Sequence, residues 1–320
     1  MRQSKRFLVV AAVFLSAVSI SLEARAERKI GILMFSDEVR YNEAMAGITD
    51  RLREDGYSEP ATRITVGHAD ANKARAAELV KQYSAEKMDL IITLGTSMTV
   101  PVAREIKDVP IVFGVVYDPV EAGIAKDWIS SGNNTTGATT RFPLEKTISI
   151  LREFRKVGRL AVLYTPGEKN SEAQLKDLQK IQHLDGIKII PVPLTKKEEV
   201  GQILPEVLRT CDALYVTGSN LVNSQISTIV EMATKANVVT VTHLDDLVAK
   251  GVLLAVCSDS YQNGRMVGEK AVRILKGAKP SSIPIESPKE QHVMINMETA
   301  RAGQFRIPEE FMKKVTRKVH

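Results

Sequence analysis

The chain has 320 residues with 44 basic and 38 acidic side chains, for a formal net charge of +6, and it is 44% apolar and 26% charged. This length suffices for two domains of ordinary size, and the composition is that of a globular protein. Aromatic residues make up only 5% of the chain and the basic residues are scattered. Both observations argue against a surface that stacks bases or tracks a phosphate backbone, so we expect no nucleic-acid partner.

The first 26 residues have the pattern of a secretory signal peptide. Basic residues precede an apolar run from Phe7 to Leu22, and Ala24 and Ala26 form a small-x-small cleavage site. We expect residues 1–26 to be removed, so that the mature protein begins at Glu27 in the periplasm. Because no cysteine follows the apolar run, we expect neither a lipid anchor nor stable membrane insertion after cleavage.

From Lys29 onward, short apolar runs alternate with segments of helical periodicity. In the first half, we predict strands at 29–35, 61–66, 90–94 and 110–116, and helices at 41–55, 72–86 and from Thr96 onward. In the second half, we predict strands at 160–164, 187–192, 212–216, 238–242, 252–256 and 293–296, and helices at 144–155, 172–184, 197–209, 221–236, 244–250, 263–276 and 308–319. This alternation predicts βαβ units and parallel sheets with right-handed crossovers.

Two similar turns lie in the two halves of the chain. The run DLIITLGTS (89–97) is a buried strand followed by Gly95 and the hydroxyl residues Thr96 and Ser97, and ALYVTGSN (213–220) repeats the pattern. A hydroxyl at a helix start can cap backbone N–H groups, or the same N–H groups can hold a carboxylate. Both roles remain open for one turn, but two copies predict two lobes that face one ligand.

The sequence lacks the common motifs of catalysis and metal binding. There is no GxGxxG after the first strand and no GxxxxGK[ST], and the turn GTSMT lacks the closing glycine of a nucleophile elbow. The five histidines are scattered and have no cysteine partner. We therefore expect no enzyme activity, no cofactor and no metal site.

Three polar residues at strand ends could meet a ligand. His243 follows the strand 238–242 and could contact a ligand or cap a turn. Asp118 and Asp259 also follow apolar strands, where a carboxylate could hold a ligand's ammonium group, although acidic residues are common in turns without any function.

The chain has two cysteines, Cys211 and Cys257. They are expected at opposite edges of one parallel sheet, too far apart for a disulfide. We predict two separate buried thiols.

The motifs, taken in order, resemble those of the ABC-transporter substrate-binding proteins, in the group that includes tryptophan- and tyrosine-binding members. The segments that carry the resemblance are KIGILMFS, DLIITLGTS, VVYDPVEAGI, NNTTGATT, LYTPGEKNS, DALYVTGSN, LLAVCSDSYQNGR and AVRILKGAKPSSIPIE. They span nearly the whole chain after the signal peptide, from Lys29 to about Thr299.

The resemblance implies an α/β fold of the type I periplasmic binding protein class, with two doubly wound parallel-sheet lobes joined by a three-segment hinge. Residues 27–139 plus 259–287 would form one lobe, and 140–258 plus 288–320 the other. By similarity, the ligand pocket would draw on the following strand-edge residues: Ser36, Thr96, Ser97, Asp118, Asn170, Ser171, Ser219, Asn220, His243, Asp259 and Tyr261.

The sequence departs from the family pattern at two pocket positions. Many members carry Thr-Asp-Asn where this chain has Gly218-Ser219-Asn220, and many have an acidic residue or serine in place of His243. The loss of a carboxylate makes a plain α-amino acid a less suitable ligand than a less cationic or differently charged molecule.

By resemblance, the protein would be the soluble, monomeric solute-binding component of an ABC importer, delivering a small polar ligand to an inner-membrane permease with its ATPase. Two alternatives remain: a ligand-sensing protein that partners a membrane sensor kinase, and an exported enzyme on the same fold.

Overall fold

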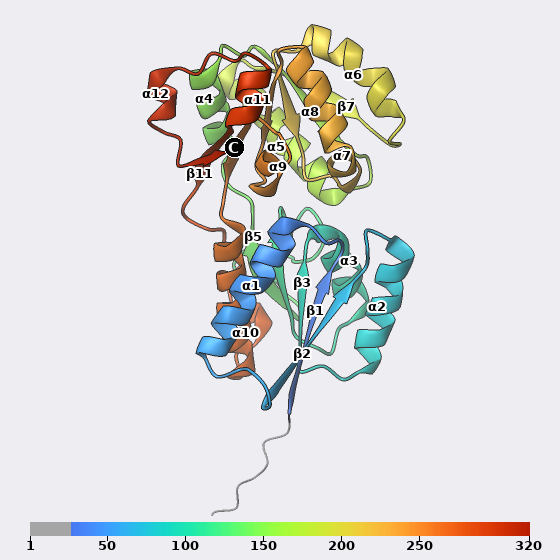
Figure 1. Ribbon diagram of the computed structural model, residues 1–320. Coiled ribbons are helices and arrows are strands. Elements are labelled where there is room, and N and C mark those ends of the chain that lie inside the picture. The colour runs from blue at the N-terminus through green and yellow to red at the C-terminus, as the bar shows by residue number, and fades with distance from the viewer. Residues whose placement is uncertain (1–26) are drawn as a thin grey trace, which may run out of the picture.

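The structure is a computed structural model that describes residues 27–320, so the predicted signal peptide lies outside the described residues. Two α/β lobes are stacked one above the other, each built on its own sheet (Figure 1). Within residues 27–320 no helix combines the length and the apolar character needed to cross a membrane.

The first lobe contains a five-stranded parallel sheet in the order β2-β1-β3-β4-β5. Its strands are β1 (Arg28–Met34), β2 (Thr62–His68), β3 (Leu90–Leu94), β4 (Ile111–Val116) and β5 (Thr135–Thr139). Its helices are α1 (Val39–Glu54), α2 (Lys73–Ala85), α3 (Thr96–Glu105), α10 (Ser260–Leu275) and the 3-10 turn η1 (Pro280–Ser282).

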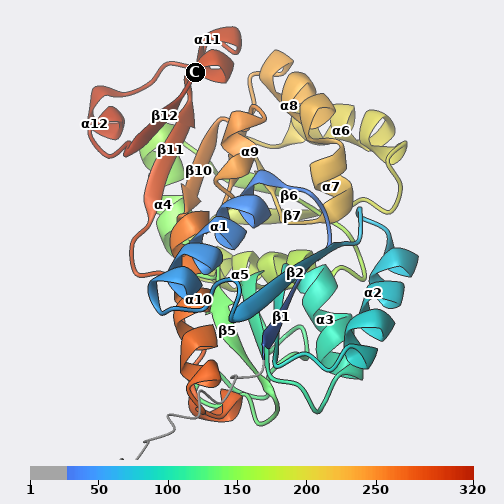
Figure 2. The ribbon, with the colours of Figure 1, turned by 60° about the horizontal axis from the view of Figure 1, so that its bottom comes forward.

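Both faces of this sheet are covered. Side chains of β1 pack alternately against α1 with α10 on one face and against α2 with α3 on the other. Gly47 and Gly264 let α1 and α10 approach so closely that a Cβ at either glycine would overlap the backbone of the other helix. The segment that returns from the second lobe is thereby fixed against the first helix (Figure 2).

The second lobe contains a seven-stranded sheet in the order β12-β11-β10-β9-β8-β6-β7, parallel except for the pairing of β10 with β11. Its strands are β6 (Arg159–Tyr164), β7 (Lys188–Pro193), β8 (Ala213–Val216), β9 (Val239–Thr242), β10 (Leu254–Cys257), β11 (His292–Asn296) and β12 (Arg317–Val319). Its helices are α4 (Glu145–Phe154), α5 (Lys169–Asp185), α6 (Glu199–Thr210), α7 (Asn220–Ser224), α8 (Ile226–Lys235), α9 (Asp246–Ala249), α11 (Met297–Ala302) and α12 (Glu309–Met312).

The chain passes between the two sheets after β5, after β10 and before β11. The lobe boundaries predicted at 139/140, 258/259 and 287/288 fall in these connections. The exact borders between the two lobes remain a proposal.

Two predicted helices differ from the structure. The helix predicted at 221–236 is interrupted at Gln225, giving α7 and α8. The terminal helix predicted at 308–319 is wrong: only α12 is helical, and residues 317–319 form a strand along the edge of β11. The β-branched residues in and just before this strand, Val315, Thr316 and Val319, favour that pairing.

Cys211 and Cys257 are both buried and free, which confirms the prediction of two separate thiols. Burial raises the pKa of Cys211 to about 11, so its thiol stays protonated and unreactive at neutral pH.

Candidate functional site

The candidate site is the cleft where the two lobes meet. The carboxyl ends of β3 and β4 from the first lobe face those of β8 and β9 from the second, with the loops that follow them. Its lining residues are Arg40, Tyr41, Thr96, Ser97, Val115, Tyr117, Thr140, Asn170, Gln174, Gly218, Asn220, His243 and Leu244. The cavity between them has a volume of about 20 Å³, room for about one water molecule, so the lobes are closed.

On the first lobe, the turn into α3 presents two hydroxyl residues to the cleft. Gly95 has φ +85°, a conformation that favours glycine, and a Cβ there would also overlap the hydroxyl of Tyr41. The chain can therefore turn directly from β3 into α3. This places Thr96 and Ser97 in the first turn of α3, where the backbone N–H groups lack carbonyl partners within the helix.

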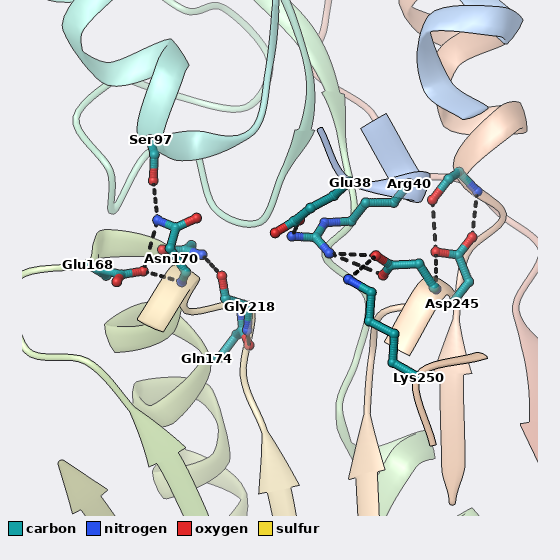
Figure 3. Close-up of polar contacts among 12 residues, drawn as sticks. Glu38, Arg40, Ser97, Glu168, Asn170, Gln174, Gly218, Asp245 and Lys250 are labelled. Atoms are coloured by element: carbon teal, nitrogen blue, oxygen red, sulfur yellow. Dashed lines mark hydrogen bonds and ion pairs between the residues drawn. The ribbon is translucent and has the colours of Figure 1, made fainter. Parts of the chain in front are cut away.

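On the second lobe, amide side chains hold the loop after β8. Gln174 accepts a hydrogen bond from the Gly218 N–H at 3.0 Å, and Asn170 donates to the Gly218 carbonyl at 2.5 Å. The Asn220 N–H donates to Glu168 at 2.7 Å (Figure 3). Burial raises the pKa of Glu168, although its hydrogen bonds to the start of α7 oppose this effect. These contacts fix the position of Asn220 at the cleft.

Of the polar contacts that join the lobes, two involve residues of the cleft lining and are described here (Figure 3). Asn220 donates its side-chain N–H to the Ser97 hydroxyl at 2.8 Å. Arg40, in the first turn of α1, donates to both carboxylate oxygens of Asp246 at 2.9 and 3.1 Å. Both contacts join one lobe to the other, so they form only when the lobes are closed.

Each member of the cross-lobe ion pair also has a partner in its own lobe. Arg40 contacts Glu38, and Asp246 lies 3.8 Å from Lys250. Burial, the largest single influence, would lower the pKa of Arg40, but Coulombic attraction and hydrogen bonds to Asp246 and Tyr41 together outweigh it and raise that pKa. When the lobes separate, neither charge loses all its partners, so the contact can break and re-form.

His243 forms part of an uncharged aromatic wall. It is 3% exposed, and burial together with the positive charge of Arg40 lowers its pKa to about 3. Its Nδ1 lies 3.2 Å from the Tyr215 hydroxyl, and its ring contacts Tyr117 edge-on with 5.3 Å between centroids. At neutral pH this histidine is therefore a neutral, polar ring in the cleft.

The structure brings five of the predicted site residues to the cleft: Thr96, Ser97, Asn170, Asn220 and His243. It places the other six outside the cleft lining, where most of them stabilise nearby turns. The ligand contacts predicted for all eleven remain a prediction.

The two predicted strand-end carboxylates are engaged elsewhere. Asp118 accepts hydrogen bonds from two backbone N–H groups of the following turn and pairs with Arg141 at 2.8 Å. Asp259 caps the start of α10 and lies 3.4 Å from Arg317. Neither is free to receive an ammonium group in this arrangement.

Three other predicted residues form internal hydrogen bonds. Ser171 donates to backbone carbonyls around the start of α5, and Ser219 caps α7 while bonding to Thr165. Tyr261 donates its hydroxyl to Asp50 of α1. Ser36 is buried beyond the cleft lining, and within the described part of the chain its hydroxyl has no hydrogen-bond partner.

Sequence reasoning missed several lining residues, among them Arg40, Tyr41, Tyr117 and Gln174. Tyr117 directly follows β4, so its place at a strand edge was visible in the sequence. Arg40 and Tyr41 lie in the first turn of α1, the helix that follows β1. Gln174 lies one turn into α5 and gave no such indication.

A family model described as "ABC transporter substrate binding protein" matches residues 29–319. The chain belongs to this family. Among its relatives is a "Tyrosine-binding protein" of Clostridioides difficile (strain R20291), 25% identical over 283 residues, which cover 88% of this chain and 82% of the relative. The family and the type I periplasmic binding protein fold were both predicted from the sequence, and both are confirmed.

Two solved structures are similar in fold. An ABC domain from Streptococcus pneumonia in complex with L-Trp is 24% identical with a TM-score of 0.86, and the alignment covers 92% of this chain and 100% of that one. A ligand-free, open substrate binding protein from Clostridium difficile is 25% identical with a TM-score of 0.73 at the same coverage.

Proposed function

We propose that the protein binds a small polar solute, an amino acid or a related molecule, between its lobes in the periplasm and delivers it to an inner-membrane ABC permease with its ATPase. The observation that carries this proposal is the cleft between the lobes, which is lined by polar side chains of both. The relatives named for tyrosine binding and solved with L-Trp support a ligand of this size.

Binding would proceed by opening and closing of the lobes. Since the closed cavity of about 20 Å³ cannot admit a solute, the lobes must separate at the three connecting segments before a ligand enters. A ligand that contacts both lobes then favours a closed form, because only that form offers all its partners. The permease would recognise the closed, liganded form of a monomer that has no catalytic role.

A thermal-shift screen tests the binding step. The full chain, expressed with its own N-terminal segment and purified, is screened against amino acids, carboxylic acids, nucleosides, sugars and amines. A solute at a hundred times its dissociation constant stabilises the fold by about 2.7 kcal/mol, a readily measured shift. If no solute stabilises the protein, the binding role is wrong.

Uptake of the identified solute tests the delivery step. Cells that lack the gene should lose high-affinity uptake and regain it on complementation. Normal uptake combined with loss of a solute-induced transcriptional response would instead identify a sensor-kinase partner.

A further inference from the structure

The charge of the cleft narrows the class of solute. We propose that the site takes an organic monocarboxylate with an apolar or aromatic body and no charged ammonium group. This inference rests on the proposed function and specifies its ligand.

The cleft lining contains one cation, which is already paired, and no anion. Among its lining residues within the described chain there is no aspartate or glutamate, and Arg40 carries the one formal charge. His243 is neutral, and the remaining polar groups are hydroxyls and amides. A zwitterionic amino acid would bury an ammonium group with only neutral acceptors around it, which is unfavourable because a buried charge requires a paired charge.

The carboxylates nearest the cleft are already occupied. Glu38 and Asp246 both contact Arg40, and Asp118 pairs with Arg141. Glu168 accepts hydrogen bonds from Asn220 and the next residue at the start of α7. An ammonium group could reach one of them only by displacing a partner that is already in place.

A ligand carboxylate, in contrast, has partners on the first lobe. The first turn of α3 offers backbone N–H groups at its positive end and the hydroxyls of Thr96 and Ser97. The Arg40 guanidinium is on the same lobe and has five N–H donors; its Nη1 donates to Asp246 and its Nη2 contacts Glu38. The first turn of α3 therefore favours a carboxylate through the positive end of the helix and the positions of its N–H and hydroxyl donors.

The cleft mouth is also basic. A cavity of about 380 Å³ lies between α2, α3 and the start of α5. It shares four lining residues with the inner cleft, which are Thr96, Ser97, Asn170 and Asn220. Its lining includes Lys73, Arg104 and Lys169 against one acid, Glu168. Two of these cations also have acidic neighbours on their own helices, which leaves a modest positive surplus that would attract anions.

The body of the ligand would meet rings and aliphatic groups. Tyr41, Tyr117 and neutral His243 line one part of the cleft, with Val115 and Leu244 beside them. Such a wall suits a phenyl or branched alkyl group.

Matched compounds that differ by one charged group test the proposal. Titration calorimetry on the full chain, freed of carried-over ligand by reversible unfolding, would compare 3-phenylpropionate, L-phenylalanine and 2-phenylethylamine. A second set would be 4-methylpentanoate, L-leucine and isopentylamine. We expect the carboxylate of at least one set to bind at least tenfold more tightly than its amino acid, and the amines not to bind.

A variant that adds a charge inside the cleft provides the second test of the proposal. Gln174→Glu keeps the oxygen that accepts the Gly218 N–H but adds a negative charge to the cleft, so it should weaken carboxylate binding at least tenfold and favour the amino acid. Gln179→Glu, on the exposed side of the same helix, is the matched control and should leave both affinities unchanged.

These experiments distinguish failure of the monocarboxylate inference from failure of the proposed function. If L-phenylalanine or L-leucine binds as tightly as its deaminated partner, the inference falls while the solute-binding role stands. If neither set binds and the broad screen finds another solute, the monocarboxylate class is wrong. If that screen is also blank, the proposed function itself fails.

Discussion

Neutralising Asp246 should favour the open form of the protein. Asp246→Asn removes the negative charge that meets Arg40 across the cleft, where the two side chains are 1% and 3% exposed. Because Arg40 keeps its contact with Glu38 inside the first lobe, the variant should fold normally. The main effect is therefore expected on the equilibrium between open and closed lobes.

The magnitude follows from the geometry of the pair. Hydrogen bonds to charged groups contribute about 1.5–3 kcal/mol each, and Arg40 donates two to Asp246. Desolvation on closing offsets much of this gain, and both charges retain partners in their own lobes when open. A net loss of about 1–3 kcal/mol would shift the equilibrium about 5- to 150-fold toward the open form.

Distances between spin labels on exposed positions of α2 and α5 would measure this shift by double electron–electron resonance. The native cysteines are both buried, which allows selective labelling at introduced cysteines. Glu54→Gln is the control, since it removes an ion pair with Arg265 that lies within the first lobe. If Asp246→Asn and Glu54→Gln give the same distance distribution as the parent protein, the cross-lobe pair does not stabilise closure.

Three further predictions concern stability. The pKa of His243 is about 3 in the fold against 6.5 for an ordinary histidine, so between these pH values the unfolded state binds one more proton than the folded state. The free energy of unfolding should therefore fall by up to about 1.4 kcal/mol per pH unit as the pH drops through that window. Urea titrations at pH 7 and 4.5 should show a weaker pH dependence for His243→Gln, and an unchanged dependence would refute the assignment. Gly95→Ala should lower the melting temperature more than Gly56→Ala, because both glycines have positive φ but only a Cβ at Gly95 would overlap Tyr41; equal losses would show that backbone strain alone matters. Gly264→Ala should destabilise the first lobe, because the added Cβ would overlap α1. Gly201→Ala has open space around it in α6 and should stabilise the protein by about 0.5–1 kcal/mol. Scanning calorimetry should therefore show a lower melting temperature for Gly264→Ala and a higher one for Gly201→Ala.

The order of strands and helices could be predicted from the sequence because it depends on local patterns. Apolar runs such as 90–94 are buried on both faces of a parallel sheet and so appear as continuous apolar segments. The turn at Gly95 was also predictable, since a glycine followed by hydroxyl residues indicates a strand-to-helix turn. At the C-terminus the local pattern was insufficient, because β12 forms only by pairing with β11.

The site was less predictable because the role of each side chain depends on partners that are distant in the sequence. An aspartate at the end of a strand has the same local sequence whether it binds a ligand or caps a turn, and the role of Asp118 is decided by Arg141 and two backbone N–H groups. Arg40 meets Asp246 across 206 positions of sequence, a contact that exists only because the lobes close. No local motif could indicate it.

The central claim is that one solute is held by both lobes at once. Titration calorimetry with the best solute from the screen would compare the parent protein with Ser97→Ala in the first lobe and Asn170→Ala in the second. Ser224→Ala, an exposed hydroxyl outside the cleft, is the control. We predict one solute per chain, a loss of at least tenfold in affinity for each cleft variant, and no change for the control; unchanged affinity in the variants of either lobe would contradict binding between the lobes.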